Sequence, residues 1–522
     1  MQSSVIIFLR TSHPSVKLHG MSLIRLQSAA FLGLDATPVE VEVDVMSVLE
    51  KCTLVIVGLP DAAVKESKDR VLAAIKNSGF TPEDIVSTVN LAPGTLKKEG
   101  PLYDLPIALG LIYAMKNQAP PEFPYLVIGE LGLSGEVRPI RGTLAMAMLA
   151  KKQGLKGILL PAMNAHEAAS IPDIDVIPIH HLKDAVKFVT DHSTIPPAPR
   201  EISDQLFVNA RAPVDFADIK GQVHVKRAME IAAAGGHNAI LSGPPGSGKS
   251  MVAKAMLGII PELTLEEALE VTKVYSVAGL LKEGQSLMTC RPFRSPHHTI
   301  SYAGLIGGGT QPRPGEVSLA HNGVLFLDEL PEFSRSVLEV LRQPLEDGQV
   351  TISRAQGHLT FPTQFICIAA MNPCPCGYLG HPDKPCRDTQ VQVNRYRNKI
   401  SGPLLDRMDL HIDVPSLRYS DYAEAANAES SVQIRDRVKR ARLRQHQRFM
   451  RVQTNAQMSS AQIKSFCELN QEGHQLMQEA VDSMGISARA VDRILRVALT
   501  IADLDERVMG AEHILEAISY RR

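Results

Sequence analysis

The sequence lacks the features of a secreted, membrane-spanning or strongly charged protein. It contains seven cysteines in 522 residues and has a formal net charge of −1. A small, odd number of cysteines argues against a secreted disulfide framework and for a reducing compartment. A net charge near zero gives no indication of a nucleic-acid or acidic partner, so such a partner must be sought in local patches. The chain has no run of 18 apolar residues, so we expect no membrane-spanning helix.

The start of the chain also lacks a targeting signal. The stretch "SSVIIFLR" has an apolar core of only five residues, which is too short for a signal peptide. Met21 opens "MSLIRLQSAAFLG", a more natural start than Met1, so we interpret residues 1–20 as an N-terminal extension, with a mis-called start as the alternative. We therefore expect a cytoplasmic protein without a membrane partner.

The length and the changes of pattern along the chain predict about three domains. Residues 21–190 alternate strand and helix patterns, and residues 191–213 include the proline-rich "STIPPAPRE", typical of a linker. A second α/β pattern covers 214–415, and long helical patterns fill 416–522. The strands predicted in the first domain are 39–45, 52–59, 84–92, 125–133 and 157–161, with an amphipathic helix over 61–79.

The strongest motif lies in residues 238–257, "NAILSGPPGSGKSMVAKAML". An apolar strand, a glycine-rich loop and a helical pattern follow one another, as the phosphate-binding pattern G-x-x-x-x-G-K-[ST] requires. Glycines let backbone N–H groups approach phosphate oxygens, and a helix N-terminus favours the same anion. Lys249 would place its charge at the β- and γ-phosphates, and the Ser250 hydroxyl would bind Mg²⁺. The predicted nucleotide-binding residues are Gly243, Pro244, Pro245, Gly246, Ser247, Gly248, Lys249 and Ser250.

Two further strand ends complete the predicted hydrolytic site. The apolar strand in "NGVLFLDEL" (322–330) ends at Asp328 and Glu329. Asp328 would hold Mg²⁺, directly or through water, and Glu329 would polarise the attacking water; an acidic helix start is the alternative. The strand in "TQFICIAAMNP" (363–373) ends at Asn372, which would orient that water, although Asn before Pro is also an ordinary turn signal.

These strand ends together resemble the AAA+ ATPases. The stretches "SGPLLDRMDLHIDVP" (401–415) and "ISARAVDRILRVALTIADL" (486–504) are similar to the magnesium-chelatase-like branch, and within it to the YifB/competence protein ComM family. The resemblance covers nearly the whole chain from Met21. It implies a P-loop ATPase core with a parallel sheet over 214–415, a C-terminal helical lid over 416–522 and a hexameric ring.

The resemblance also implies roles for three residues. Asn372 would be sensor 1, Arg407 the arginine finger that reaches the nucleotide of a neighbouring subunit, and Arg489 sensor 2. An arginine near a helix end is otherwise usually a solvated charge or a surface ion pair.

Two insertions interrupt the predicted ATPase core. Residues 290–323 contain "GGG" and several prolines, which favour a projecting loop over packed core, and residues 348–365 hold two β-type runs around the turn 354–357. The resemblance implies that such inserts enter a central pore and grip nucleic acid; solvated loop residues are the alternative. The candidate DNA contacts are Arg294, His297, His298, Arg354 and His358. The basic helical stretch 434–451 is either a phosphate-contacting stripe or a solvated connecting helix.

The first domain resembles the proteolytic domain of Lon proteases, an α+β, S5-like fold. Residues 96–111 lie where that family carries its catalytic serine, and residues 132–161 lie where it carries the lysine. These positions hold Leu102 and Leu144, and no serine lies between 96 and 111. Without a Ser–Lys dyad no nucleophile is available, so we expect a binding and ring-assembly platform rather than a protease.

A cysteine loop over 374–388, "CPCGYLGHPDKPCRD", follows Asn372. Cys374, Cys376 and Cys386 supply three sulfur ligands, with Asp388 or His381 as the fourth, and zinc accepts either set in tetrahedral geometry. A structural zinc that stiffens this loop is the preferred interpretation; a metal-free turn with remnant thiols is the alternative.

These features predict an ATP- and Mg²⁺-dependent motor that acts on single-stranded or branched DNA. In the family it would be a branch-migration helicase that supports integration of DNA during natural transformation, with recombination proteins as possible partners. A magnesium chelatase ATPase subunit that drives metal insertion is one alternative, disfavoured by the Lon-like domain. An ATP-gated scaffold is another, disfavoured because Glu329 and Arg407 are present as hydrolysis requires.

Overall fold

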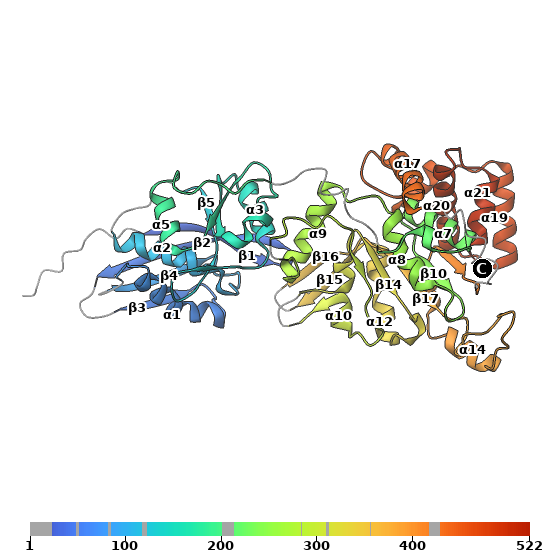
Figure 1. Ribbon diagram of the computed structural model, residues 1–522, viewed down its shortest axis with the longest axis horizontal. Helices are drawn as coiled ribbons and strands as arrows, with labels where there is room; N and C mark the ends of the chain where they lie inside the picture. Colours follow the sequence, from blue (N-terminus) through green and yellow to red (C-terminus); the bar gives the residue numbers. More distant parts are fainter. Residues whose placement is uncertain are drawn as a thin grey trace, which may run out of the picture. The chain divides into compact units, whose positions relative to one another are not determined.

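The computed structural model describes residues 23–47, 52–81, 85–116, 123–200, 213–282, 284–309, 313–354, 357–416 and 429–521 (Figure 1). The chain forms two compact units, residues 1–200 and 201–522. The interpretation of residues 1–20 as an extension lies outside the described residues, as do residues 201–212 of the predicted linker.

The first unit is built on a mixed seven-stranded sheet in the order β3-β4-β2-β1-β5-β8-β9. The central strands β1, β2 and β4 are antiparallel, whereas β3 pairs parallel with β4, and β5, β8 and β9 follow in parallel. Val39, Val41 and Val43 alternate along β2 and are fully buried, as a period of two places them on one face. The strands are β1 Ile24–Leu32, β2 Asp35–Ser47, β3 Thr53–Val57, β4 Ile85–Ala92, β5 Tyr125–Val127, β6 Glu130–Leu131, β7 Val137–Arg138, β8 Gly157–Pro161 and β9 Asp175–Ile179, and the α-helices are α1 Ala62–Asn77, α2 Asp104–Met115, α3 Thr143–Lys152, α4 Ala165–Ala168 and α5 Leu182–Thr190.

Four of the five strands predicted for this unit, and its predicted helix, agree with the structure. The predicted strands 39–45, 52–59, 84–92 and 157–161 correspond to β2, β3, β4 and β8, and the predicted helix to α1. The stretch 125–133 instead divides into β5 and β6, which belong to different sheets. The divided stretch contains Gly129 at φ 159, a backbone geometry that interrupts a regular strand.

The second unit contains a five-stranded sheet in the order β11-β14-β17-β10-β18, and all of its pairs are parallel. The residues of β14 and β17 are all buried, which explains their continuous apolar sequence. In a parallel sheet the carboxyl ends of all strands meet at one edge, so the loops after β10, β14 and β17 are neighbours. The strands are β10 Ala239–Ser242, β11 Phe293–Arg294, β12 Gly307–Gly308, β13 Arg313–Pro314, β14 Val324–Leu327, β15 Gln349–Arg354, β16 Gly357–Pro362, β17 Ile366–Met371 and β18 Leu410–Asp413.

The helices of the second unit fall into two groups along the chain. Those between and beside the strands are α7 Val223–Gly235, α8 Lys249–Ile259, α9 Leu265–Ala278, α10 Tyr302–Ile306, α11 Glu316–Leu319, α12 Arg335–Val340, α13 Arg342–Asp347, α14 Gln390–Arg397 and α15 Gly402–Leu405. Those that follow the sheet, grouped near the C-terminus in Figure 1, are α17 Ser431–Phe449, α18 Ser460–Phe466, α19 Gln471–Met484, α20 Ala488–Leu504 and α21 Ala511–Ser519. Within the described residues after 416 the regular elements are all helical.

The two predicted insertions differ in structure. Strands β15 and β16 form the predicted antiparallel hairpin, in which Arg354 pairs with Gly357 across a turn whose tip lies outside the described residues. The segment 290–323 is more packed than a projecting loop. It contributes β11 to the sheet, and Leu305 and Val317 on α10 and α11 are fully buried. The glycines and prolines of this segment suggested a projecting loop, and the burial of its apolar residues was not recognised from the sequence.

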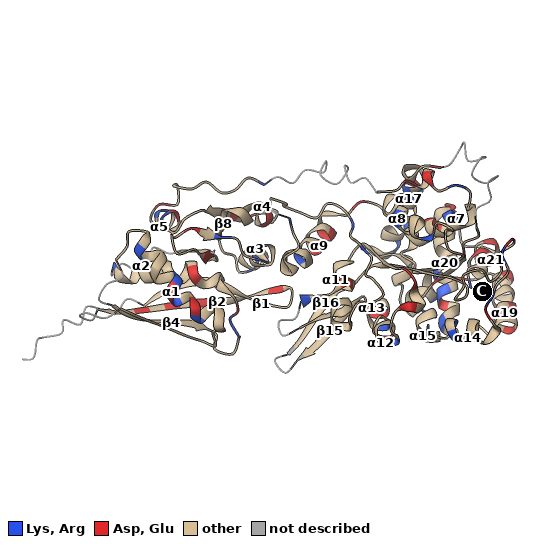
Figure 2. Cartoon of the chain, turned by 60° about the horizontal axis from the view of Figure 1, so that its bottom comes forward, with Lys and Arg blue, Asp and Glu red and all other residues tan. Residues whose placement is uncertain are grey.

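The basic stretch 434–451 forms α17, whose Ile434, Val438, Ala441 and Phe449 are buried. Figure 2 shows acidic and basic segments side by side around this helix. Most of its cations are paired inside the unit: Arg437 with Glu230 and Glu429, Arg448 with Asp503, Arg440 and Arg444 with Glu506, and Arg435 and Lys439 with Glu262. The structure therefore favours neither a free phosphate-binding stripe nor a solvated connector, because the helix packs in the core and most of its cations are paired with acidic side chains.

Among the described residues, no helix combines the length and the apolar character needed to cross a membrane.

Candidate functional site

The predicted phosphate loop joins the end of β10 to the start of α8. Gly246 and Gly248 have φ angles of 79° and 88°, which side-chain-bearing residues rarely adopt. Gly248 is the N-cap residue of α8, so the first N–H groups of an 11-residue helix point toward the loop. Gln222 donates a hydrogen bond from Nε2 to the carbonyl oxygen of Ser247 at 2.9 Å and supports the loop from outside. The loop has the form that cradles phosphate groups.

Lys249 is held inside this loop by its own backbone. Its Nζ donates to the carbonyl oxygens of Gly243 and Pro244 at 2.7 and 2.9 Å, and to Oδ1 of Asn372 at 3.3 Å. Burial lowers the pKa of the Lys249 ammonium group, and the charge of Asp328 acts in the opposite direction. Incoming phosphate oxygens would replace these neutral carbonyls with charged acceptors, which strengthens the interaction.

Ser250 and Asp328 come from separate strand ends and meet directly. The Ser250 hydroxyl donates to Oδ2 of Asp328 at 2.8 Å, and the second oxygen of Asp328 accepts from the backbone N–H of Glu329 at 2.9 Å. A hydroxyl and a carboxylate at this spacing are oxygen ligands of the kind that Mg²⁺ prefers. The two residues predicted for Mg²⁺ therefore lie together.

Glu329 begins a sharp turn after β14, with a φ angle of 52°. Its carboxylate is 61% exposed and lies 3.4 Å from Nδ1 of His298. The His298 ring packs edge-on against Phe333 and lies 4.1 Å, between centroids, from the ring of His297. His298 was predicted as a DNA contact, but the structure places it beside the acid predicted to polarise water, because β11 and β14 are parallel neighbours.

The remaining candidates for DNA contact have different surroundings. Arg294 donates from Nε and Nη2 to both carboxylate oxygens of Glu316, at 2.6 and 2.7 Å, and this pair raises its pKa. His297 is exposed and hydrogen-bonds the Thr299 hydroxyl through Nδ1, and His358 is exposed on β16 beside Ser353. The Arg354 side chain lies outside the described part of the chain.

Arg407 lies at the edge formed by the amino ends of the strands, opposite the phosphate loop, three residues before β18. It is 6% exposed and donates to the carbonyl oxygens of Arg342 and Pro403 at 3.0 and 2.7 Å, with an ion pair to Glu346. Burial lowers the pKa of its guanidinium group, and the charges of Arg342, Arg493 and Arg489 add to this effect. Strands β10 and β18 are parallel, so a four-residue strand, about 13 Å long at about 3.3 Å per residue, separates Arg407 from the phosphate loop.

Arg489 is exposed in the first turn of α20 and lines a cavity of about 850 Å³ at this same edge. The amino ends of β10, β14 and β17 form one wall, and α17 and α20 contribute the others. The structure thus brings Arg489 near Arg407 and places both apart from Lys249. The cationic lining residues are Arg291, Lys439, Arg442, Arg451, Arg489, Arg493 and Arg496.

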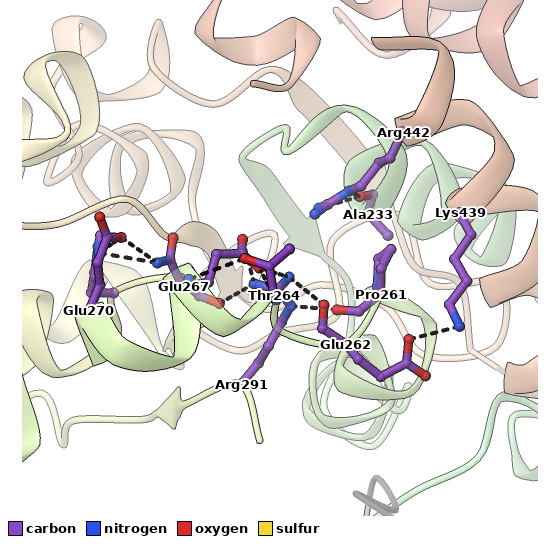
Figure 3. A network of polar contacts seen from close by, with 11 residues as sticks. Ala233, Pro261, Glu262, Thr264, Glu267, Glu270, Arg291, Lys439 and Arg442 are labelled. Carbon is purple, nitrogen blue, oxygen red and sulfur yellow. Dashed lines mark hydrogen bonds and ion pairs between the residues drawn. The ribbon is translucent and has the colours of Figure 1, made fainter. Parts of the chain in front are cut away.

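A polar network holds one side of this cavity in place (Figure 3). Arg291 donates to the carbonyl oxygens of Pro261 and Glu262 and to the carboxylate of Glu267. Lys439 pairs with Glu262 at 2.8 Å, and Arg442 donates to the carbonyl oxygen of Ala233. The Arg442 guanidinium group is held by a neutral partner, and burial lowers its pKa.

The predicted cysteine loop forms a compact cluster. The sulfur atoms of Cys374, Cys376 and Cys386 are 3.4–3.6 Å apart, and one carboxylate oxygen of Asp388 lies within 4.8 Å of all three. The backbone N–H of Cys376 donates to Oδ2 of Asp388 at 2.8 Å. His381 is turned to its own loop, where Nδ1 accepts from the backbone N–H groups of Asp383 and Lys384. The residues present fit a metal ion with three sulfur ligands and one oxygen ligand.

The positions matched to the missing protease dyad are buried in the first unit. Leu102 is 6% exposed before α2, and Leu144 is fully buried on α3. Neither side chain carries a group that could act as a nucleophile or base.

The sequence analysis did not identify Gln222 or Asp409 as supporting residues. It identified His298, but not its contact with Glu329. Asp409 accepts from Arg493 of α20 at 2.7 Å and from the backbone N–H of Asn238 at 3.1 Å. Its position in "DRMDL", two residues after Arg407, was a signal. However, its partner lies 84 positions along the chain and cannot be found from a local pattern.

Three family profiles match the chain. The one described as "Magnesium chelatase, subunit ChlI" matches residues 215–422, "Subunit ChlI of Mg-chelatase" matches 41–164, and "Magnesium chelatase, subunit ChlI C-terminal" matches 428–521.

Two relatives match along nearly their whole length. The chain is 41% identical to the YifB protein of Escherichia coli over 505 residues, which cover 96% of this chain and 97% of that protein. It is 42% identical to competence protein ComM of Haemophilus influenzae over 509 residues, with 96% and 98% covered. A shorter match, 26% over 176 residues and 31% of each chain, links it to Lon protease 2 of Bacillus subtilis.

Proposed function

The chain belongs to the magnesium-chelatase-like family that includes YifB and competence protein ComM, and on this premise we propose that it is an AAA+ ATPase motor that acts on DNA. The observation that carries the ATPase is the meeting of Lys249, the Ser250–Asp328 pair and Glu329 at the carboxyl edge of one parallel sheet. Phosphate binding, metal binding and water activation are the three requirements of nucleoside triphosphate hydrolysis.

Each residue has a separate task in the proposed reaction. The loop N–H groups and Lys249 hold the phosphates, and Ser250 and Asp328 provide the oxygen ligands for Mg²⁺. When bound, Mg²⁺ neutralises charge on the β- and γ-phosphates. Glu329 accepts a hydrogen bond from the attacking water, and Asn372, which already contacts Lys249 at 3.3 Å, orients the same water or the γ-phosphate.

A ring assembly is part of the proposal. Arg407 and Arg489 lie at the edge of the sheet opposite the phosphate loop, so they are suited to the nucleotide of a second copy. Such a contact in trans requires an assembly of at least two copies, and the family resemblance favours a closed homo-hexamer. Release of Arg407 from Glu346 would free the guanidinium group for the γ-phosphate.

We propose DNA as the substrate along which the motor moves, because the chain is 42% identical to competence protein ComM over 98% of that protein's length. We propose branch migration on single-stranded or branched DNA during natural transformation and homologous recombination, in the cytoplasm and with recombination proteins as partners. The hairpin β15–β16, which carries the exposed His358, is the insert best suited to grip a strand. Arg294 is less suited, since Glu316 already occupies its guanidinium group.

The first unit is proposed as a Lon-like platform without protease activity. The partial similarity to Lon protease 2 supports the likeness, and the buried Leu102 and Leu144 support the loss of the reaction.

A magnesium chelatase-type ATPase subunit is the second candidate. The descriptions of the three matching family profiles favour it, whereas the nearly full-length similarity to ComM favours the DNA motor.

The cofactors in this proposal are ATP and Mg²⁺, with Zn²⁺ as a structural ion in the cysteine cluster. The sulfur triangle of Cys374, Cys376 and Cys386 is the observation that supports zinc.

The ATPase rate with and without single-stranded and branched DNA tests the function. We expect DNA to raise the rate, and we expect Glu329→Gln to bind ATP but to hydrolyse it at least about 100-fold more slowly, because a general base contributes about that much. Lys249→Ala is the comparison that loses binding as well. Hydrolysis without any DNA binding or stimulation would contradict the DNA motor while leaving the ATPase intact.

A further inference from the structure

We propose that the ion held by Cys374, Cys376, Cys386 and Asp388 fixes the conformation of the phosphate loop, so that zinc occupancy sets nucleotide affinity. This inference rests on the structural zinc and the ATP site proposed above. Two groups of contacts carry it: the geometry of the four ligands, and the contacts that join their loop to Pro245 and Asn372.

The sulfur atoms already have the spacing that zinc imposes. Zn–S bonds of about 2.3 Å in a tetrahedron place two sulfur ligands about 3.8 Å apart. The three observed separations are 3.4, 3.6 and 3.5 Å, which form a nearly equilateral triangle. A disulfide needs about 2.05 Å and joins only two sulfurs, so the arrangement of three favours a metal.

The fourth ligand is Asp388. Its Oδ2 accepts from the Cys376 N–H at 2.8 Å and lies 3.8 Å from the sulfur of Cys386, so the carboxylate faces the triangle. A hydrogen bond to a ligating carboxylate is the usual way in which its orientation is fixed. His381 is excluded as the fourth ligand by its own contacts. Its Nδ1 accepts a hydrogen bond from the backbone N–H of Asp383, and its ring centroid lies 5.7 Å from that of Tyr378.

The loop that carries the cluster lies directly against the phosphate loop. Gly377, between two of the ligand positions, has a φ angle of 82°, and a Cβ atom placed there would come within 2.6 Å of Cδ of Pro245. Glycine is needed at this point both for its backbone conformation and for the close approach. The Cys376–Tyr378 backbone therefore cannot shift toward the phosphate loop without displacing Pro245.

A second connection runs through the strand end. Asn372, which contacts Lys249, lies two residues before Cys374, and the carbonyl oxygen of Pro373 accepts from Nε of Arg397 on α14 at 3.2 Å. The cluster thus closes a loop whose start carries Asn372 and whose end leads into α14. With the ion bound, Asn372 and Pro245 are both fixed from one side; without it, this support is lost.

The experiment measures zinc content and nucleotide affinity on the same preparations, without relying on hydrolysis. Protein purified without chelator is analysed by elemental mass spectrometry, and binding of a fluorescent ADP analogue is titrated. We expect about one zinc per chain in the wild type. We expect Cys386→Ser to lose zinc and to weaken ADP binding by roughly tenfold, within the usual range for coupled sites.

Two variants serve as controls. Cys290→Ser removes an exposed cysteine outside the cluster and should change neither quantity. Gly377→Ala keeps all four ligand side chains but adds a Cβ against Pro245, so it should weaken ADP binding while zinc content stays the same. Circular dichroism on each variant identifies loss of folding, and Gly377→Ala keeps the test valid if Cys386→Ser does not fold.

Linkage gives an independent measurement. If zinc favours nucleotide binding, nucleotide must favour zinc retention by the same factor. We expect ADP to lower the fraction of zinc that a competing colorimetric chelator takes up at equilibrium. No zinc in the wild type would overturn both the structural zinc and this inference. Zinc that is present in the wild type and lost in Cys386→Ser without any change in ADP affinity would overturn the coupling alone, and an ADP affinity too weak to measure in the wild type would overturn the ATP site.

Discussion

At the scale of single residues, the contact between His298 and Glu329 links an insert of the core to the proposed hydrolytic acid. His298 is 30% exposed, and its Nδ1 lies 3.4 Å from the carboxylate of Glu329. Its ring also lies next to the rings of Phe333 and His297. The Glu329 side chain is 61% exposed, so we expect the contact with His298 to restrict the rotamers of its carboxylate.

We therefore expect His298→Ala to lower kcat for ATP by about tenfold while KM changes much less, because misplacement of a catalytic group lowers the rate more than it lowers binding. Steady-state ATPase kinetics without DNA provide the measurement. His358→Ala is the matched control, since His358 is exposed on the hairpin and hydrogen-bonded to Ser353, and it should leave both constants unchanged. An unaltered kcat in His298→Ala would show that the contact does not position Glu329.

At the scale of elements, a buried ion pair joins the segment of Arg407 to the C-terminal helices. Asp409, directly before β18, pairs with Arg493 of α20 at 2.7 Å and lies 3.5 Å from His237 of the turn after α7. His237 in turn contacts Thr500 of α20 at 2.8 Å. The sheet and α20 are thus joined by a polar network in which Asp409, His237 and Thr500 are almost completely buried and Arg493 is 18% exposed.

Removing one charge from this network should destabilise the second unit. We expect Asp409→Asn to lower the free energy of unfolding by about 3 kcal/mol, because breaking a buried pair leaves Arg493 without its counter-charge. Urea unfolding followed by circular dichroism measures the loss. Glu506→Gln, at the exposed pairs with Arg440 and Arg444, should stay within about 0.5 kcal/mol; an equal loss in both variants would contradict the prediction.

The same pair has a defined pH dependence. Burial would raise the pKa of Asp409, but the hydrogen bond with His237 and the charge of Arg493 outweigh it and hold that pKa well below its usual range. A depressed folded-state pKa gives stability that is present above the unfolded value and lost as the pH falls through the folded value. The wild-type advantage over Asp409→Asn should therefore persist at neutral pH and decline only below about pH 4.

At the scale of the whole molecule, the two halves of the proposed catalytic apparatus lie at opposite edges of one sheet. The phosphate loop follows the carboxyl end of β10, and Arg407 precedes the amino end of the parallel strand β18. A single chain therefore cannot bring Arg407 to its own Lys249 without rebuilding the sheet. If two copies share each nucleotide site, the phosphate loop of one copy and Arg407 of the other can act on the same nucleotide.

Mixing two inactive variants tests this sharing. Lys249→Ala lacks the phosphate contact and Arg407→Ala lacks the finger, so each alone should be nearly inactive. In a mixed assembly the intact loop of one variant meets the intact arginine of the other, and up to about a quarter of the wild-type ATPase rate should return if copies assemble head to tail at random.

Lys249→Ala mixed with Glu329→Gln is the matched control. Both changes affect the same edge of the sheet, so no mixed site is complete and no activity should return. Failure of the Lys249→Ala and Arg407→Ala mixture to recover activity, with assembly verified by light scattering, would contradict action in trans.

The sequence by itself determined the local features of this protein. The phosphate loop, the acids after β14 and the asparagine after β17 follow from strand–loop–helix patterns, because each depends on residues close together in the chain. The hairpin strands β15 and β16, and the strands β2, β3, β4 and β8 of the first unit, were predictable for the same reason. The cysteine cluster was also predictable, since its ligands fall within 15 residues.

Only the tertiary structure decided which distant residues meet. The order β11-β14-β17-β10-β18 placed His298 beside Glu329 and separated Arg407 from Lys249, and neither result is present in any local pattern. The tertiary structure also decided the surroundings of the basic helix α17. Its cations suggested a phosphate-binding surface in the sequence, but in the structure most of them pair with acidic residues, up to 207 positions away. The sequence left open whether Asp388 or His381 would be the fourth ligand, and the fold groups Asp388, rather than His381, with the three sulfur atoms. The physical reason is common to these cases: charge and ligand geometry depend on packing between segments, which the chain specifies only as a whole.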